Sequence, residues 1–242
     1  FTGNLRNNLA VGNGGNGFYF DLERGEFIGN LQNNTARGNG ADGFHINLLG
    51  GEFRGAITDN LAENNGGDGF FIDLSDGILM GSTLAQGING QISLSFLRNR
   101  AINNDGHGFH LKFVNLESVI AHNTAIGNRL AGFYIQIGND FKATGRFRHN
   151  VADKNGFNGF FFDIFDDLEG TIENNTARSN TGAGFLIIVG DDFQGNADGL
   201  GTPVFFQNNV AGANSGHGFD IRVKEDLELA FFINNRATPV SY

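Results

Sequence analysis

The 242-residue chain has no cysteine, no tryptophan, one methionine and two prolines. Without cysteine, disulfide bonds and thiolate metal sites are excluded, although the cellular compartment stays open. No apolar run approaches the roughly 20 residues of a membrane-spanning helix, so we expect no membrane insertion. Basic residues are also scarce. Lys and Arg number 16 against 26 Asp and Glu, and a net charge of −10 disfavours nucleic acid as a partner.

Glycine and phenylalanine are abundant instead, with 38 and 26 copies, and asparagine recurs throughout the chain. Glycine and asparagine are poor helix formers, and no apolar stripe with helical spacing persists over three turns. An α-helical fold is therefore disfavoured.

One eleven-residue phrase, N-x-A-x-x-N-x-x-x-G-F, is repeated eight times. We number its first asparagine 0, which places alanine at +2, the second asparagine at +5, glycine at +9 and phenylalanine at +10. The asparagines at position 0 are Asn8, Asn34, Asn60, Asn99, Asn123, Asn150, Asn175 and Asn209. The phenylalanines at +10 are Phe18, Phe44, Phe70, Phe109, Phe133, Phe160, Phe185 and Phe219.

Two or three short strands are predicted in each repeat. Apolar and polar residues alternate after position +10, as in FYFDL at 18–22 and FDIRV at 219–223, which indicates a strand with one buried face. Position −3 is always large and apolar and marks the second strand. Such a repeat is too small to bury its own apolar face, so it must stack on its neighbours as a solenoid.

Stacking at about 4.8 Å per coil would align equivalent residues into columns. We expect the phenylalanine column to fill the interior and the alanine column to mark a place with room only for a methyl group. Glycine at +9 suits either a positive φ or a close backbone approach. Asparagine suits a left-handed corner and can hydrogen-bond from coil to coil. The alternative for the asparagines is an exposed binding surface.

These repeat residues resemble those of right-handed parallel β-helix proteins of the pectin-lyase-like superfamily, in particular the NosD-like periplasmic copper-site maturation proteins. The resemblance implies an all-β fold: a single right-handed parallel β-helix of about eight to nine coils over residues 1–242. We expect loop insertions at about 75–95 and 190–205, and no capping helix. The resemblance also favours carbohydrate as a ligand, but it implies no particular reaction.

In families with this fold, ligands commonly lie on the outward face of one parallel sheet. Here positions +11 and +13 should form that face. The rings predicted at +11 are Tyr19, His45, Phe71, His110, Tyr134 and Phe161. Such a row could stack against sugar rings of a polysaccharide. The alternatives are that aromatic residues are simply good strand formers, or that long loops cover them.

No catalytic residue is assigned, but the strongest candidates lie on the same face. They are Asp21, Asp73, Lys112 and His110, with Asn47 and His45 beside them. The inventory is similar to that of lyases of this fold, which combine Ca²⁺-binding carboxylates with a basic residue that removes a proton. The motifs of polygalacturonases and alginate epimerases are absent, so whether the chain is an enzyme stays open, and a non-enzyme is favoured.

Two groups of residues are metal candidates. His122 and His149 share position −1 on adjacent coils, and two imidazoles can bind a transition metal, although a solvated pair is the favoured alternative. Carboxylates follow the main strand in several repeats, among them Asp166, Asp167, Asp191 and Asp192. Ca²⁺ would relieve their repulsion. A charged rim that keeps a solenoid soluble is the favoured interpretation, so no cofactor is assigned.

The two ends of the sequence lie in the same phase of the repeat, and neither resembles a cap. We therefore expect self-assembly, head to tail, into a fibre or layer. A section of a longer solenoid is the alternative. The first residue, Phe1, fits removal of a signal peptide but equally a chain cut from something longer. The predicted function is an extracellular or cell-surface structural protein. The alternative function is a carbohydrate-binding or polysaccharide-cleaving protein.

Overall fold

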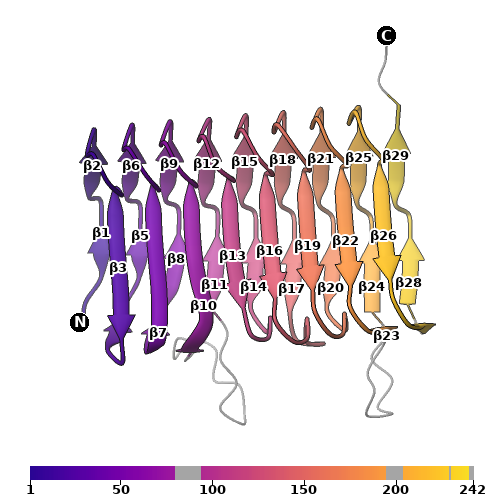
Figure 1. Ribbon diagram of the computed structural model, residues 1–242, viewed down its shortest axis with the longest axis horizontal. Coiled ribbons are helices and arrows are strands. Elements are labelled where there is room, and N and C mark those ends of the chain that lie inside the picture. The colour runs from indigo at the N-terminus through magenta and orange to yellow at the C-terminus, as the bar shows by residue number, and fades with distance from the viewer. Residues whose placement is uncertain (80–93, 195–203, 229, 240–242) are drawn as a thin grey trace.

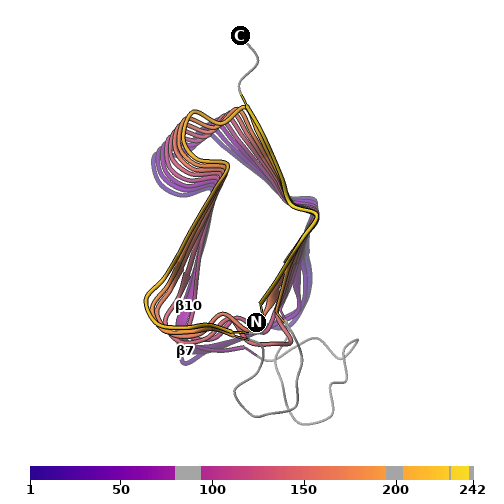
Figure 2. The ribbon, with the colours of Figure 1, turned by 90° about the vertical axis from the view of Figure 1, so that its right-hand side faces the viewer.

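A computed structural model describes residues 1–79, 94–194, 204–228 and 230–239. These residues form a right-handed parallel β-solenoid without helices, which confirms the predicted fold class (Figure 1). No helix in these ranges is long and apolar enough to cross a membrane. Viewed along its axis, the coils superimpose on one closed outline (Figure 2).

Each coil supplies strands to three parallel sheets. Sheet I carries position −3 and consists of β1 (Leu5–Arg6), β5 (Leu31–Gln32), β8 (Ala56–Thr58), β11 (Ser95–Leu97), β14 (Val119–Ala121), β17 (Arg146–Arg148), β20 (Thr171–Glu173), β24 (Val204–Gln207) and β28 (Ala230–Ile233). Sheet II carries position +2 and consists of β2 (Leu9–Val11), β6 (Thr35–Arg37), β9 (Leu61–Glu63), β12 (Arg100–Ile102), β15 (Thr124–Ile126), β18 (Val151–Asp153), β21 (Thr176–Arg178), β25 (Val210–Gly212) and β29 (Arg236–Thr238).

Sheet III carries position +10. It consists of β3 (Phe18–Glu23), β7 (Phe44–Arg54), β10 (Phe70–Leu79), β13 (Phe109–Phe113), β16 (Phe133–Ile137), β19 (Phe160–Ile164), β22 (Phe185–Val189) and β26 (Phe219–Val223), with β4 (Glu26–Ile28) paired to β7. A small fourth sheet joins β23 (Phe193–Gln194) to β27 (Leu227–Glu228). Most of both predicted insertions, residues 80–93 and 195–203, lies outside the described residues.

The phenylalanine column fills the interior, as predicted. Successive rings at +10 stack with centroids 4.6 to 5.2 Å apart, close to the spacing of parallel strands. The six inner rings are completely buried, while Phe18 and Phe219 at the two ends are partly buried. Where position −3 is also phenylalanine, as at Phe96 and Phe147, its ring meets the column edge to face. Each inner coil is thereby packed against both neighbours.

Glycine at +9 is required by a close approach and not by its φ angle. None of these glycines has a positive φ. A Cβ added to Gly43 would lie 2.7 Å from the carbonyl oxygen of Gly69 and 2.8 Å from Cβ of Ala62. The same contacts recur along the column, so a small residue at +9 and a methyl at +2 of the next coil require one another.

The prediction that the repeated asparagines occupy left-handed corners is wrong. No asparagine at position 0 or +5 has a positive φ. The left-handed residues precede them, at −1 and +4. At −1 they are Asn7, Asn33, Asp59, Arg98, His122, His149, Asn174, Asn208 and Asn234. At +4 they are Gly12, Gly38, Asn64, Asn103, Gly127, Lys154, Ser179 and Ala213. The chain turns at these residues, and each asparagine begins the segment after the turn.

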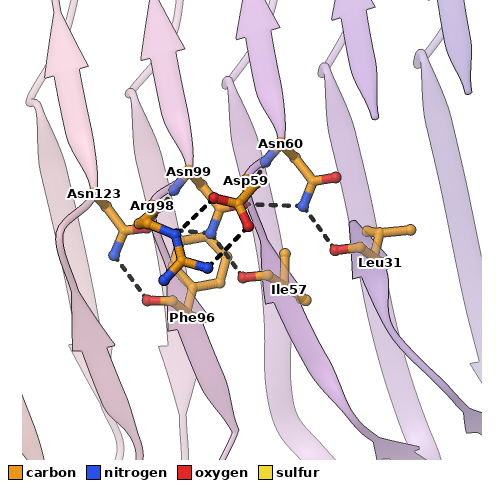
Figure 3. A network of polar contacts seen from close by, with 8 residues as sticks. All are labelled: Leu31, Ile57, Asp59, Asn60, Phe96, Arg98, Asn99 and Asn123. Carbon is orange, nitrogen blue, oxygen red and sulfur yellow. Dashed lines mark hydrogen bonds and ion pairs between the residues drawn. The ribbon is translucent and has the colours of Figure 1, made fainter. Parts of the chain in front are cut away.

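The repeated asparagines form two internal ladders, as predicted. The amide of Asn99 shows the pattern (Figure 3). Its Nδ2 donates to Oδ1 of Asn123 on the next coil and to the carbonyl of Ile57 on the previous one. Its Oδ1 accepts from the backbone N–H and from Nδ2 of Asn60. Both hydrogens and both acceptor directions of the buried amide are therefore used.

This pattern explains why the position requires asparagine. After the left-handed turn, the backbone N–H of each asparagine has its acceptor in the side chain of the next coil, not in a strand. A second ladder at +5 repeats the arrangement, with Ala62 and its equivalents supplying the carbonyl. Leucine would leave buried donors without partners, and aspartate would lack the two N–H donors.

Candidate functional site

The predicted row of rings lies on the outward face of sheet III. Strands of this sheet alternate buried and partly exposed residues, so positions +11 and +13 point away from the interior. The strand register aligns the six predicted rings, and successive centroids lie 4.6 to 5.1 Å apart. We call this set the ring row; it consists of Tyr19, His45, Phe71, His110, Tyr134 and Phe161.

Three of the five neighbouring pairs in the ring row stack face to face, whereas Phe71 and His110 meet edge to face at 88°. His45 stacks on Phe71 at an interplanar angle of 22°, and Tyr134 stacks on Phe161 at 18°. A sugar ring binds to the face of an aromatic ring, but stacked neighbours present their edges to solvent. Tyr19 differs, because 58% of its surface is exposed and its hydroxyl donates to Asp21. The best stacking surface for a sugar is therefore at Tyr19.

The +13 residues form a polar row beside the ring row. Asn47 Nδ2 donates to Asp21 Oδ1 over 3.3 Å, and Lys112 Nζ lies 3.2 Å from Asp73 Oδ2. Burial opposes ionisation of Asp73, yet hydrogen bonds from Ser75 and the proximity of Lys112 hold its pKa below its usual value.

Lys112 has two partners on the neighbouring strand β10. Besides its ion pair with Asp73, its ammonium lies 5.2 Å from the centroid of the Phe71 ring. A lysine that removes a proton must offer a free amine, whereas carboxylate and ring face are partners of an ammonium. The structure thus places the catalytic candidates Asp21, Asp73, Lys112 and His110 on one face, with two of them neutralising each other.

A third column, at position +8, was not predicted from the sequence. It contains Asn16, Asp42, Asp68, His107 and Asn158. Each of these side chains accepts a hydrogen bond from the backbone N–H of the same position on the next coil. The signal was present in the sequence, because six of the eight residues at +8, His217 included, carry a side-chain acceptor directly before the invariant glycine.

Two aspartates of this column also hold histidines of the ring row. Asp42 Oδ2 lies 2.8 Å from Nδ1 of His45, and Asp68 Oδ2 lies 3.1 Å from Nδ1 of His110. On its other side, His110 Nε2 lies 3.0 Å from Gln136 Oε1. These contacts fix the orientation of both imidazoles on the outer face.

Asp68, His107 and His110 bring three potential metal-ligand atoms within 4.8 Å of one another. The hydrogen bonding of His107 opposes metal binding by this cluster. Its Nδ1 accepts from the backbone N–H of Ala131, so the neutral ring carries its hydrogen on Nε2. Burial lowers the pKa of His107, with Asp68 acting in the opposite direction, which favours that neutral ring. Metal binding through Nε2 would require the ring to give up the bond to Ala131.

The two histidines predicted at position −1 do lie together. The rings of His122 and His149 stack with centroids 4.9 Å apart and an interplanar angle of 6°. Desolvation, the neighbouring His149 and two arginines lower the pKa of His122. No carboxylate or third histidine joins the pair in a metal-binding group among the described residues.

The predicted acidic residues gather at one edge of the solenoid. Asp167 belongs to two potential cation-binding groups, one with Asp140 and Asp166 and one with Asp191 and Asp192. Desolvation and the neighbouring carboxylates raise the pKa of Asp166. Asp140, Asp167 and Asp192 each also accept the backbone N–H of the next coil. These carboxylates therefore serve as a structural ladder whether or not a cation is bound.

Comparisons with protein-family models, curated proteins and solved structures find no match for this chain.

Proposed function

We propose that this chain is a structural protein of the cell surface or extracellular space, in which the solenoid acts as a stiff rod. The supporting observation is the continuity of the two asparagine ladders. One runs from Asn8 to Asn235 and the other from Asn13 to Asn214, both with the same hydrogen-bond polarity, and the inner amides are fully bonded. The buried hydrogen bonds of the two ladders thus connect each coil to the next.

The ladder polarity makes the two ends complementary. At the first coil no donor among the described residues reaches Oδ1 of Asn8, whereas inner asparagines accept two hydrogen bonds there. At the last coil, Asn235 Nδ2 donates to Phe206 O, with no described asparagine beyond it. We therefore propose a second copy of the chain as partner, stacked with its Asn8 over Asn235.

Sheet III constrains this assembly. The described strands of sheets I and II number nine each, whereas the main path of sheet III has eight, from β3 to β26. A copy that continued sheets I and II would leave sheet III one strand short at the junction. The proposed filament therefore requires an additional strand to fill this position of sheet III at each junction.

The rod is tested by electron microscopy and sedimentation velocity over a range of protein concentrations. We expect particles that lengthen in steps of one chain. In Ala10→Lys, an ammonium at the inward-facing position of β2 would obstruct the end face and prevent lengthening. Val11→Lys adds the same charge to the outward face of β2 and serves as the control. Lateral clusters, or monomers at all concentrations, would contradict end-to-end stacking.

A second candidate function is carbohydrate binding at the ring row, favoured by the exposed ring of Tyr19 next to Asp21. A glycan array would identify the sugar, and absorbance of unsaturated uronates, with and without Ca²⁺, would reveal cleavage. Binding should be lost in Tyr19→Ala and retained in Leu9→Ala, which removes another exposed side chain from a different sheet. If the array shows no binding and the absorbance shows no cleavage, this function is ruled out.

A further inference from the structure

The outward face of sheet II contains a hollow near its C-terminal end. Its volume is about 440 Å³, and its lining includes Arg178, Ser179, Val210, Gly212, Arg236 and Thr238. Gly212 lies between Arg178 and Thr238 in the strand register. A Cβ at Gly212 would lie 3.0 Å from Thr238 Oγ1 and 3.8 Å from Arg178 Cγ. The missing side chain of Gly212 therefore keeps this space open.

The repeat supplies an internal comparison for Arg178. Arg37 occupies the same position, +3, and the next coil presents Glu63 opposite it. Arg37 Nε lies 2.8 Å from Glu63 Oε2. Arg178 meets Gly212 where Arg37 meets Glu63. The hollow thus lies where the repeat elsewhere provides a carboxylate.

The two arginines of the hollow have no ion-pair partner among the described residues. Asp153 precedes Arg178 in the same column, but no ion pair joins them. Arg178 and Arg236 are both exposed. Within the described part of the chain, the hollow thus brings together two arginines that have no ion-pair partner, in a protein of net charge −10. A guanidinium binds planar carboxylates through two parallel N–H donors.

We propose that this hollow binds a small carboxylate ligand, which takes the place that Glu63 occupies opposite Arg37. Arg178 holds the carboxylate, Arg236 adds a second positive charge, and the hydroxyl of Thr238 offers a further donor. This site lies on a different sheet from the ring row and does not depend on the proposed structural function.

Succinate titration of the ¹⁵N-labelled full chain, followed by NMR at constant ionic strength, tests the proposal. We expect saturable shifts of the Gly212 and Thr238 amides, with a dissociation constant on the order of millimolar, because exposed charge pairs are weak. Arg178→Ala should weaken binding at least about tenfold, which corresponds to one charge-assisted contact.

Gly212→Glu is the decisive variant, because it recreates the Arg37–Glu63 pair within the chain and should abolish succinate binding. Arg37→Ala, which removes an arginine that already has a partner, should leave binding unchanged. Unchanged succinate affinity in both Arg178→Ala and Gly212→Glu would overturn the proposal, as would shifts that grow without saturation over the whole surface.

Discussion

Removing one inner asparagine from a ladder should cost far more stability than removing the first one. Asn123 accepts from the backbone N–H and from Nδ2 of Asn99, and it donates to Phe96 O and Asn150 Oδ1. In Asn123→Ala, two donors of Asn99 lose their acceptor and Phe96 O loses a donor. At about 1–3 kcal/mol for each buried group left unsatisfied, the cost is roughly 3–9 kcal/mol.

Asn8→Ala is the matched control on the same ladder. Asn8 is exposed, and its side chain contributes two hydrogen bonds, to Asn34 Oδ1 and Arg6 O. Asn34 is buried, but its Oδ1 still accepts the backbone N–H of residue 8, and Arg6 is exposed, so we expect a loss of about 1 kcal/mol. Urea unfolding followed by circular dichroism would measure both variants, and amide hydrogen exchange at Asn99 would show whether the loss is local.

Asn123→Asp provides a test should the alanine variant fail to fold. Aspartate keeps the acceptor oxygen but lacks both N–H donors, and burial raises the pKa of its carboxyl group above that of the unfolded chain. The deficit relative to wild type should therefore shrink as the pH falls and the carboxyl group is protonated. Equal losses for Asn123→Ala and Asn8→Ala would refute the view that the ladder holds the coils together.

Three further predictions concern other positions. Lys154→Gly should stabilise the fold by about 1 kcal/mol in urea unfolding, because Lys154 has a φ of 55°, whereas Asp153→Gly in the preceding strand should destabilise it. Phe133→Ala should lower the free energy of unfolding by about 3–5 kcal/mol, because this buried ring stacks between two neighbours. Phe157 is half exposed, so Phe157→Ala should lower it by less than about 0.5 kcal/mol. Hydrogen bonds from Arg98 lower the pKa of Asp59 in the folded chain. This pair therefore stabilises the folded chain, by at most about 1 kcal/mol, when the pH is above the pKa of Asp59 in the unfolded chain. That contribution is lost as the pH falls below about 4. Wild type and Arg98→Ala should accordingly differ at pH 7 and converge near pH 2; a constant difference would contradict that assignment.

The sequence alone determined the solenoid, its coil register and the inward or outward direction of most strand residues. It could do so because the repeat has no exception at positions 0, +2, +5, +9 and +10, and because period-two alternation separates the two faces of a strand. The stacked phenylalanines and the asparagine ladders follow from the same periodicity.

Only the tertiary structure decided which atoms meet at the corners. The left-handed residues at −1 are Asn, Asp or His in every coil except that of Arg98, but the asparagines at 0 and +5 match the same preference, so residue type did not single out the corner. The Asp68–His110 contact joins position +8 of one coil to +11 of the next. A periodic sequence assigns each residue to a column, but contacts between columns depend on backbone turns and side-chain rotamers, which are set only when neighbouring coils pack together.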